Sequence, residues 1–320
     1  MRTLFVMDPI DRINVATDST YLLMLEACRR GWPVDWCEPG DLSVRDQRPV
    51  ARAARVVVTD TSPYFFPQAR QLQPLSDYEV IWMRKDPPFD MDYVFTTYIL
   101  DLALNTSLVL NDPRSIKASN EKMYALQWPE LCPTTLVSNS VRDILAFALE
   151  HEKIVIKPWD GNGGRGVLVT GKGDRNLRSM AETLTSEGRA YCIAQRYLPE
   201  INTDGDKRII LVDGEARGWF LRVPGADDHR GNMHAGASVV ACELSERERE
   251  ICAQLGPRLK KEGLLFVGID VIGGMLTEIN VTSPTGLHEV RRLMNGLRLE
   301  REITDRVAVL RAAQRDGQAP

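Results

Sequence analysis

Four glycines and one lysine gather in a stretch whose residue types suit the binding of phosphate groups. Ile154–Thr170 reads IVIKPWDGNGGRGVLVT, so Lys157 ends a β-branched run, and an extended pattern resumes at Val167. The glycines between them are Gly161, Gly163, Gly164 and Gly166. Their backbone N–H groups can approach oxygens that a side chain would keep away, and the lysine can add a positive charge. The pattern predicts a strand, glycine loop and strand folded over phosphates; a flexible turn with an incidental lysine is the alternative.

The glycine spacing does not match the common nucleotide loops. Gly161, Gly163 and Gly166 satisfy G-x-G-x-x-G, but a dinucleotide site needs that loop to open a helix, and here a strand follows. A Walker-type G-x-x-x-x-G-K-[ST] and the kinase H-R-D and D-F-G signatures do not occur in the sequence. We therefore expect a nucleotide-phosphate flap of another type.

Oxygen-bearing side chains occur together near the C-terminal end. Leu264–Ile272 is an almost wholly apolar run that contains Asp270, and a buried carboxylate is costly unless a cation pairs with it. After the turn at Gly273, Glu278 and Asn280 lie two residues apart and hence on one face of a strand. Hard oxygen ligands of this kind suit Mg²⁺ that also binds nucleotide phosphates. An acidic hairpin edge is the less favoured alternative.

Further basic residues lie where an anionic substrate could bind. The apolar run Val80–Met83 leads into Arg84 and Lys85, and the paired prolines that follow fix the loop. This predicts an anion site at the end of a strand, with a solvated turn as the alternative. Arg208 and Arg222 lie on a second predicted hairpin, followed by a polar, glycine-rich loop at 224–236 that is typical of a lid or of a disordered segment.

An apolar strand at Tyr191–Gln195 runs into Arg196–Pro199, and such a junction can form a hinge and an adenine slot, because backbone groups of an extended segment pair with a base edge. Plain core is equally compatible. Lys122 follows Asn120 and Glu121 at a predicted helix start, and by spacing alone it is an ordinary surface lysine.

The elements that position these residues predict an α/β layer followed by α+β units. Strands are expected at Leu4–Met7, 34–36, 54–58, 80–83 and 108–110, with a helix capped around Asp18 and ended by Gly31. Helices are also expected over 92–104, Val141–His151 and 177–186. A capping box at Ser245–Glu248 begins another, which Gly263 ends.

Composition narrows the function classes. The 320 residues exceed one comfortable core, and 40 basic against 44 acidic residues give a net charge of −4, so nucleic-acid partners are not expected. No apolar run is long enough for a membrane span or signal segment, which predicts a cytoplasmic protein. Six cysteines without C-x-x-C predict packed, reduced thiols, and the absence of H-E-x-x-H and G-x-S-x-G gives no support to hydrolytic chemistry.

Together these motifs resemble the ATP-grasp superfamily, and within it the bacterial glutathione synthetase family. The resemblance rests on MDPI at Met7–Ile10, MRKDPPFD at Met83–Asp90, NEK at Asn120–Lys122, KPWDGNGG at Lys157–Gly164, GDKRIILVDGE at Gly205–Glu215, RGNMHAG at Arg230–Gly236, and FVGIDVIG with LTEINVTSPTG between Phe266 and Gly286. The flap and the metal hairpin are general to the superfamily. The two N-terminal motifs and the INVTSPTG tail are much more specific.

The resemblance implies a doubly wound N-terminal substrate domain at 1–120, an ATP-grasp subdomain with the flap at 121–194, and a C-terminal subdomain at 195–320. Lys122, Lys157 and the flap glycines would bind ATP, with Gln195 and Leu198 at the adenine. Asp270, Glu278 and Asn280 would hold Mg²⁺, for which Mn²⁺ is a possible substitute. Arg208, Arg222 and Lys157 would be catalytic, and Arg84, Arg222 and Asn232 would contact substrate.

The implied reaction joins γ-glutamylcysteine and glycine through an acyl phosphate, in a homo-oligomer that is commonly a tetramer. Another ATP-grasp carboxylate-amine ligase, or a nucleotide-binding regulator without turnover, is the alternative. The sequence departs from the family pattern at Trp159, where a smaller apolar residue or tyrosine is usual, and at Ala237, where a glycine is frequent. These departures bear on lid kinetics rather than on the class of reaction.

Overall fold

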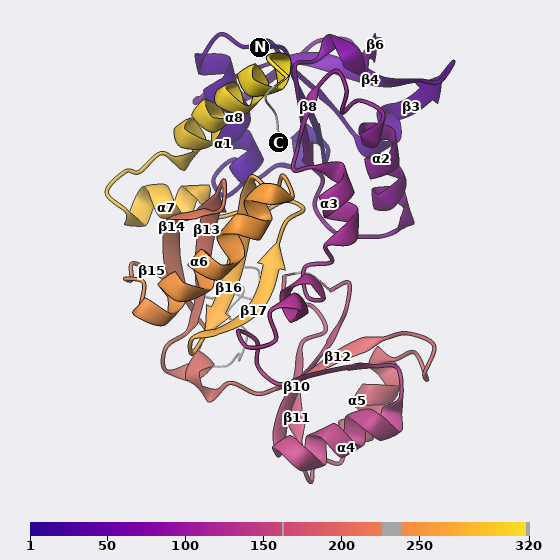
Figure 1. Cartoon of the computed structure of the whole chain (residues 1–320), viewed down its shortest axis with the longest axis vertical. Coiled ribbons are helices and arrows are strands. Elements are labelled where there is room, and N and C mark those ends of the chain that lie inside the picture. The colour runs from indigo at the N-terminus through magenta and orange to yellow at the C-terminus, as the bar shows by residue number, and fades with distance from the viewer. Residues whose placement is uncertain (162, 226–237, 318–320) are drawn as a thin grey trace.

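The computed structural model describes residues 1–161, 163–225 and 238–317, which form three sheets with helices packed on them (Figure 1). The N-terminal sheet contains β1 (Thr3–Met7), β2 (Val34–Cys37), β3 (Leu42–Arg45), β4 (Arg48–Val58), β5 (Phe65–Pro67), β6 (Gln71–Pro74), β7 (Val80–Arg84) and β8 (Leu108–Leu110). The second contains β9 (Thr135–Ser138), β10 (Lys153–Pro158), β11 (Leu168–Gly171) and β12 (Cys192–Arg196). The third contains β13 (Asp206–Val212), β14 (Glu215–Val223), β15 (Ser238–Val240), β16 (Phe266–Ile272) and β17 (Met275–Asn280).

The helices of the described chain are α1 (Ser19–Arg29), α2 (Met91–Asp101), α3 (Pro113–Ala118), α4 (Val141–His151), α5 (Leu177–Leu184), α6 (Glu246–Lys261), α7 (Leu287–Leu293) and α8 (Leu299–Arg315). The capping box predicted for α6 is present, because the side chains of Ser245 and Glu248 each accept from the other residue's backbone N–H. Asp18 caps α1 by accepting from the Tyr21 N–H at 2.8 Å.

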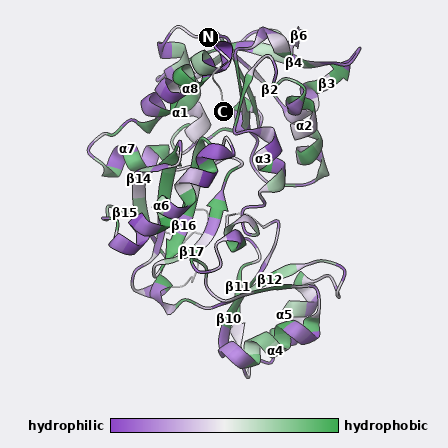
Figure 2. Cartoon of the chain, viewed as in Figure 1, coloured by the Kyte–Doolittle hydropathy of each residue, from purple (hydrophilic) through white to green (hydrophobic). Residues whose placement is uncertain are grey.

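The N-terminal unit is a doubly wound α/β layer, as predicted. Its strands follow the order β3-β4-β2-β1-β7-β8, in which β2, β1, β7 and β8 are parallel. Side chains of β1 alternate between two cores: Leu4 and Val6 pack toward α2 and α3, whereas Phe5 and Met7 pack toward α1 and α8. Every residue of β1 is buried, which explains the apolar run from Leu4 to Met7. Figure 2 shows hydrophilic and hydrophobic residues alternating on the helices.

The second sheet is a small antiparallel layer in the order β11-β10-β12-β9, covered by α4 and α5. The glycine loop connects β10 to β11, which pair from Lys153 opposite Gly171 to Ile156 opposite Leu168. The strand, glycine loop and strand predicted from the sequence are therefore present. This layer lies at the bottom of Figure 1, apart from the N-terminal unit.

The third sheet follows the order β15-β14-β13-β16-β17, and each neighbouring pair is antiparallel. Ile210 and Phe266 from this sheet join the same core as Phe5 and the helices α1 and α8. The third sheet is thus fixed to the N-terminal unit by a shared apolar core, and its strands carry most of the charged residues of the site.

The start of α7 is held by the N-terminal unit. Gly286 precedes the helix at φ 128° and supplies no side-chain cap. The Ser19 hydroxyl accepts instead from the Gly286 and Leu287 N–H groups at 3.2 and 3.3 Å. α8 then returns to α1, where Arg30 contacts Asp305 at 2.6 Å. Both ends of the described chain consequently contribute to one unit (Figure 1).

The helix expected to begin at Asn120 is absent, and this prediction was wrong. Asn120 does act as a cap-like residue, because its Oδ1 accepts from the N–H groups of Lys122 and Met123 at 3.2 and 3.1 Å. The chain then forms only a single 3₁₀ turn at Tyr124–Gln127. Pro129 follows closely and removes a backbone donor, so the turn does not extend.

Candidate functional site

The β16–β17 hairpin brings the predicted oxygen-bearing residues together. Asp270 stands directly opposite Glu278, and Asn280 stands opposite Gly268. The Asn280 amide donates to the Gly268 carbonyl at 3.1 Å and lies 3.3 Å from Asp270 Oδ2. Three side chains with oxygen atoms therefore share one face at the end of the hairpin.

Two arginines from the neighbouring strands surround Asp270. Arg208 on β13 donates to both carboxylate oxygens, at 2.6 and 3.1 Å, and Arg222 on β14 approaches Oδ1 at 2.9 Å. All three residues are buried. Burial alone would raise the pKa of Asp270, but the two arginines outweigh it and lower the pKa. Asp270 is therefore held as a carboxylate at neutral pH.

Asp206 is a fourth member of this cluster that was not among the predicted site residues. Its Oδ2 accepts from Arg222 at 2.5 Å. Burial raises the pKa of Asp206 to about 6, with Arg222 opposing the rise and Asp270 adding to it. One sequence signal points to it: Asp206 and Arg208 lie two residues apart on β13 and hence on the same face.

Two lysines converge on Glu278 from different parts of the chain. Lys122 Nζ lies 3.6 Å and Lys157 Nζ 3.7 Å from Glu278 Oε1. Both lysine side chains are buried, and Lys122 also donates to the Gly161 carbonyl in the flap. Burial lowers the pKa of Lys157, with Glu278 opposing the shift and Lys122 adding to it. Lys122 is thus not the surface lysine that its spacing alone indicated.

The flap needs glycine for its backbone conformation. Gly163, Gly164 and Gly166 have φ angles of 58°, 79° and 71°, a region that residues with a Cβ atom rarely adopt. At Gly161 an added Cβ would lie 2.6 Å from Pro158 Cγ. The predicted glycines therefore form one tight loop next to Lys157, while Asn162 lies outside the described residues.

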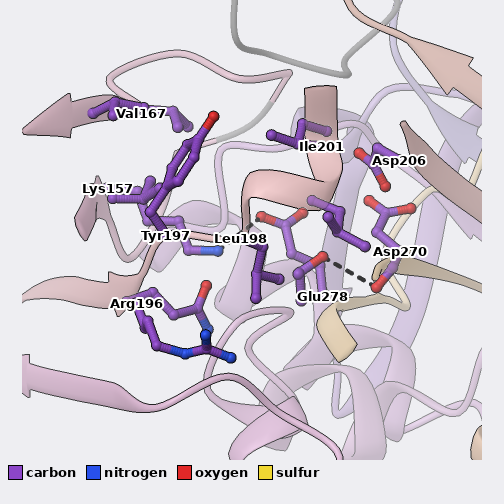
Figure 3. Close-up of a pocket in the computed structure, with 14 residues that line it drawn as sticks. Lys157, Val167, Arg196, Tyr197, Leu198, Ile201, Asp206, Asp270 and Glu278 are labelled. Carbon is purple, nitrogen blue, oxygen red and sulfur yellow. Dashed lines mark hydrogen bonds and ion pairs between the residues drawn. The ribbon is translucent and has the colours of Figure 1, made fainter. Parts of the chain in front are cut away.

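An apolar slot extends from the β10–β11 hairpin to the charged cluster. Val155, Val167, Val169, Leu198, Ile201 and Ile272 line it together with Lys157, Gln195, Arg196, Tyr197, Asp206, Asp270, Thr277 and Glu278. Figure 3 shows Val167 and Tyr197 on one side, with Asp206, Asp270 and Glu278 at the opposite end. Gln195 donates to the Thr135 hydroxyl at 3.0 Å. The slot can accept a flat apolar group whose polar extension reaches the charges.

Arg84 reaches the same region from the N-terminal unit. Its Nε donates to the Thr20 hydroxyl at 3.1 Å and its Nη2 to the Pro284 carbonyl at 2.9 Å, while Arg208 donates to the adjacent Thr285 carbonyl. Within the described residues no carboxylate forms an ion pair with Arg84, although it is 4% exposed. Burial lowers its pKa, but arginine stays charged, so a cation is held ready for an anion.

The hairpin side chains fit a hard divalent cation, although the described residues contain no group of three or more His, Cys, Asp or Glu that could hold a metal ion. Asp270 and Glu278 provide two carboxylates, and the amide of Asn280 can turn to present its oxygen. Two carboxylates and one amide oxygen suit Mg²⁺ that takes further ligands from phosphates. The predicted ligand set is thus gathered at one place.

Two predicted features lie outside the described residues. Asn232 and most of the loop at 224–236, together with Ala237, belong to the segment 226–237. Within the described chain, no helix is long and apolar enough to cross a bilayer.

Comparison with known proteins gives two family matches that together span most of the chain. Residues 1–117 match the N-terminal domain of prokaryotic glutathione synthetase, and residues 121–295 match the ATP-grasp domain of the same enzyme. Glutathione synthetase from Gloeobacter violaceus is 46% identical over 312 residues, which cover 95% of this chain and 96% of that protein. Glutathione synthetase from Pseudomonas aeruginosa is 45% identical over 314 residues, 97% and 98% of the two chains.

Solved structures show the same fold at low sequence identity. The crystal structure of the D-cycloserine synthetase DcsG has a TM-score of 0.65 at 17% identity and covers 95% of this chain and 99% of its own. The ATP-grasp ligase PsnB, solved with a precursor variant, Mg and ADP, has a TM-score of 0.61 at 16% identity. The match covers 96% of this chain and 97% of PsnB.

Proposed function

The chain belongs to the prokaryotic glutathione synthetase family of ATP-grasp ligases, and we propose that it joins γ-glutamylcysteine to glycine in an ATP-dependent reaction. The cysteinyl carboxylate attacks the γ-phosphorus of ATP, ADP leaves, and an acyl phosphate forms. The glycine amine then attacks the acyl carbon, and the tetrahedral intermediate expels phosphate. The products are glutathione, ADP and phosphate, and no protein nucleophile takes part.

The observation that carries this proposal is the convergence of four cationic side chains on two carboxylates at one end of an apolar slot. The cations are Lys122, Lys157, Arg208 and Arg222, and the carboxylates are Asp270 and Glu278. Phosphoryl transfer requires positioning and electrostatic stabilisation more than covalent catalysis, and such a cluster supplies both. The slot beside it suits an adenine ring.

We assign the nucleotide contacts on the same basis. Lys122 and Lys157 bind ATP phosphates, the backbone of Gly161, Gly163, Gly164 and Gly166 covers them, and Gln195 and Leu198 line the adenine slot. Support comes from the positions of Gln195 and Leu198 in the slot wall and from the two lysines at its charged end. Asp270, Glu278 and Asn280 would hold Mg²⁺, or Mn²⁺ in its place, which would neutralise charge on the phosphate oxygens.

Lys157, Arg208 and Arg222 are the catalytic residues of this proposal, because each can stabilise the negative charge that spreads over the transferred group. Arg84, Arg222 and Asn232 contact the peptide substrate. For Arg84 the support is a buried guanidinium without an ion-pair partner in the described chain. Asn232 rests on the family resemblance alone.

The domain division at 1–120, 121–194 and 195–320 is part of the proposal. The two family matches meet near residue 120, and the small antiparallel sheet occupies the middle range. A cytoplasmic location is also proposed, and it is supported by the six cysteines, all of which are free thiols.

We further propose a homo-oligomer, as the family resemblance implies a tetramer. The outer face of α2 and the residue after it carry a row of exposed apolar side chains at i, i+4, i+7 and i+11. These are Met91, Phe95, Tyr98 and Leu102, each at least half exposed. A 4-3-4 spacing of apolar residues is the pattern by which helices pair, which supports self-association through this face.

The direct test measures phosphate release from ATP and Mg²⁺ with γ-glutamylcysteine and glycine, omitting each in turn, with mass spectrometry of the product. We expect release to require both substrates and to yield the tripeptide. Release with γ-glutamylcysteine alone would show that the acceptor is not glycine. If neither substrate supports release, the chain is a ligase for another acyl donor or a nucleotide-binding regulator.

A further inference from the structure

Glu121 fastens the segment that carries Lys122 to the end of strand β17. Its carboxylate Oε1 accepts from the Thr282 hydroxyl at 2.7 Å and lies 3.3 and 3.4 Å from the Val281 and Thr282 backbone nitrogens. Its backbone carbonyl accepts from the Ile279 N–H at 2.9 Å. The side chain and main chain of Glu121 therefore accept four hydrogen bonds from residues that lie 158 to 161 positions later in the sequence.

These contacts matter because Lys122 has no helix to hold it. The segment 120–123 lies between the end of α3 at Ala118 and the short 3₁₀ turn that begins at Tyr124, and belongs to neither element. Glu121 binds the backbone of Ile279, the residue directly after Glu278. Lys122 Nζ lies 3.6 Å from that same Glu278. The position of the lysine relative to the metal-site carboxylate thus depends on the preceding residue.

The carboxylate of Glu121 occupies a position where an ionised group is costly. Burial raises its pKa, while the hydrogen bond from Thr282 and the charge of Lys122 oppose the rise and Glu278 adds to it. A buried carboxylate is tolerated when several donors satisfy it, and here three donors point at one oxygen. An apolar residue at this position would remove the partly buried charge and would also remove the side chain's connection to β17.

We propose that Glu121 is a positioning residue that places the Lys122 ammonium group at the nucleotide phosphates in register with the Glu278 carboxylate. The inference rests on the proposed function, because it assumes that Lys122 binds phosphate. In this proposal Glu121 is not a nucleotide ligand but acts through Lys122.

The test compares Glu121→Ala with Glu121→Gln, which keeps an acceptor oxygen for Thr282. Nucleotide affinity is measured by calorimetry with a non-hydrolysable ATP analogue and Mg²⁺, and the KM values for ATP and γ-glutamylcysteine are measured separately. We expect Glu121→Ala to weaken nucleotide binding by about tenfold or more, as for the loss of a hydrogen bond to a charged group. Glu121→Gln should recover most of the lost nucleotide affinity. In both variants the KM for γ-glutamylcysteine should stay within about twofold of the wild-type value.

A double-mutant cycle with Lys122→Ala decides whether Glu121 acts through the lysine. If it does, adding Glu121→Ala to Lys122→Ala should weaken nucleotide binding no further. A full, additive loss in that background overturns the inference, as does an equal rise of both KM values. A Lys122→Ala variant with normal nucleotide affinity would instead contradict the proposed role of Lys122, so the two failures are distinguishable.

Two further variants keep the test informative if Glu121→Ala does not fold. Thr282→Val removes one donor to Glu121 and should weaken nucleotide binding in the same direction by a smaller factor. Glu130→Ala, on an exposed side chain of the following loop, is the matched control and should leave nucleotide binding unchanged. A Thr282→Val variant with unaltered nucleotide affinity would overturn the inference, whereas near-normal affinity in Glu121→Gln is the expected result.

Discussion

Asp206 is a buried carboxylate of which only one oxygen has a hydrogen-bond partner in the described chain. Arg222 donates to Oδ2, while Oδ1 has none. Asp270 competes for the same arginine at 2.9 Å. The two carboxylates therefore divide the available positive charge unequally, and the pKa values shift in opposite directions: lower for Asp270, and up to about 6 for Asp206.

This asymmetry predicts how stability depends on pH. Because the folded state raises the pKa of Asp206 above its unfolded value of about 3.9, this carboxyl favours the folded state below that value, and the contribution is lost as pH rises towards 6. Asp206→Asn should remove this dependence, so the free energy of unfolding of the variant should rise relative to that of the wild type by about 2 kcal/mol between pH 4 and 6.5. Urea unfolding at several pH values measures the difference. If the difference in free energy of unfolding between Asp206→Asn and the wild type does not change with pH, the pKa of Asp206 is not raised in the folded state.

Glu278 offers a second prediction at this scale, because its carboxylate faces two lysines and belongs to the proposed metal ligands. Glu278→Gln removes the charge but keeps the shape, so the Mg²⁺ concentration for half-maximal activity should rise by at least about tenfold. Titration of activity with Mg²⁺ checks this. Glu215→Gln, at a side chain that is 69% exposed, serves as the control. An unchanged Mg²⁺ requirement in Glu278→Gln would remove this residue from the ligand set.

The sequence pointed to most of the charged residues but not to all of their partners. Asp270 could be singled out because a carboxylate within an apolar run demands a cation, and Glu278 and Asn280 because their spacing places them on one face. Asp206 and Glu121 lie in ordinary polar contexts, and their roles depend on contacts with Arg222 and with Thr282. Such contacts across distant parts of the chain leave no local pattern.

At the scale of elements, the β10–β11 hairpin combines two regular strands with a loop whose positive φ angles favour glycine. An alanine at Gly166 would adopt φ 71° and place its Cβ 3.1 Å from Pro158 Cδ. The helix α2 has two distinct faces. One face packs on the N-terminal unit through Tyr93 and Leu100, and the other face is exposed.

Gly166→Ala should therefore shift the flap out of its present conformation at a cost of roughly 1–2 kcal/mol. We expect weaker ATP binding and more phosphate release that is not coupled to product. Comparing phosphate release with tripeptide formation measures the coupling. Gly40→Ala, at a glycine with open space around it and no positive φ, is the control. Full coupling in Gly166→Ala would show that the flap does not need this conformation.

Elements with strong local signals were predictable, and those without them were not. The span Val141–His151 agrees with α4, and the capping box of α6 is present. The helix expected at Asn120 failed because the cap signal was real but Pro129 follows too closely for more than one 3₁₀ turn. A residue type that caps helices can thus also stabilise an isolated turn, as Asn120 does at the turn that contains Lys122.

At the scale of the whole molecule, the proposed site draws on all three sheets. Arg84 comes from the N-terminal unit, Lys157 from the small sheet, and Asp270 from the third. The order of the units was predictable from the motifs, but the return of α8 to α1 was not. That packing depends on apolar positions such as Ile303 and Val307, which do not reveal their partner in the sequence.

The exposed row on α2 predicts the assembly state. Phe95→Glu should place a charge at the centre of any interface formed there and lower the native mass measured by light scattering. Leu149→Glu changes an apolar side chain that is 59% exposed on α4 of the small unit and should leave the mass unchanged. A Phe95→Glu variant with the mass of the wild type would exclude this face as the contact between copies.

The packing of α8 on α1 has a consequence for synthesis on the ribosome. The N-terminal unit is translated first, yet one layer of its core comes from the last helix of the described chain, through Ile303 and Val307. Until that helix has left the exit tunnel, the apolar face of α1 lacks its cover, although both other sheets are already made. The first unit to emerge is thus the last to be completed, and a nascent chain stalled before residue 299 should bind chaperones through α1.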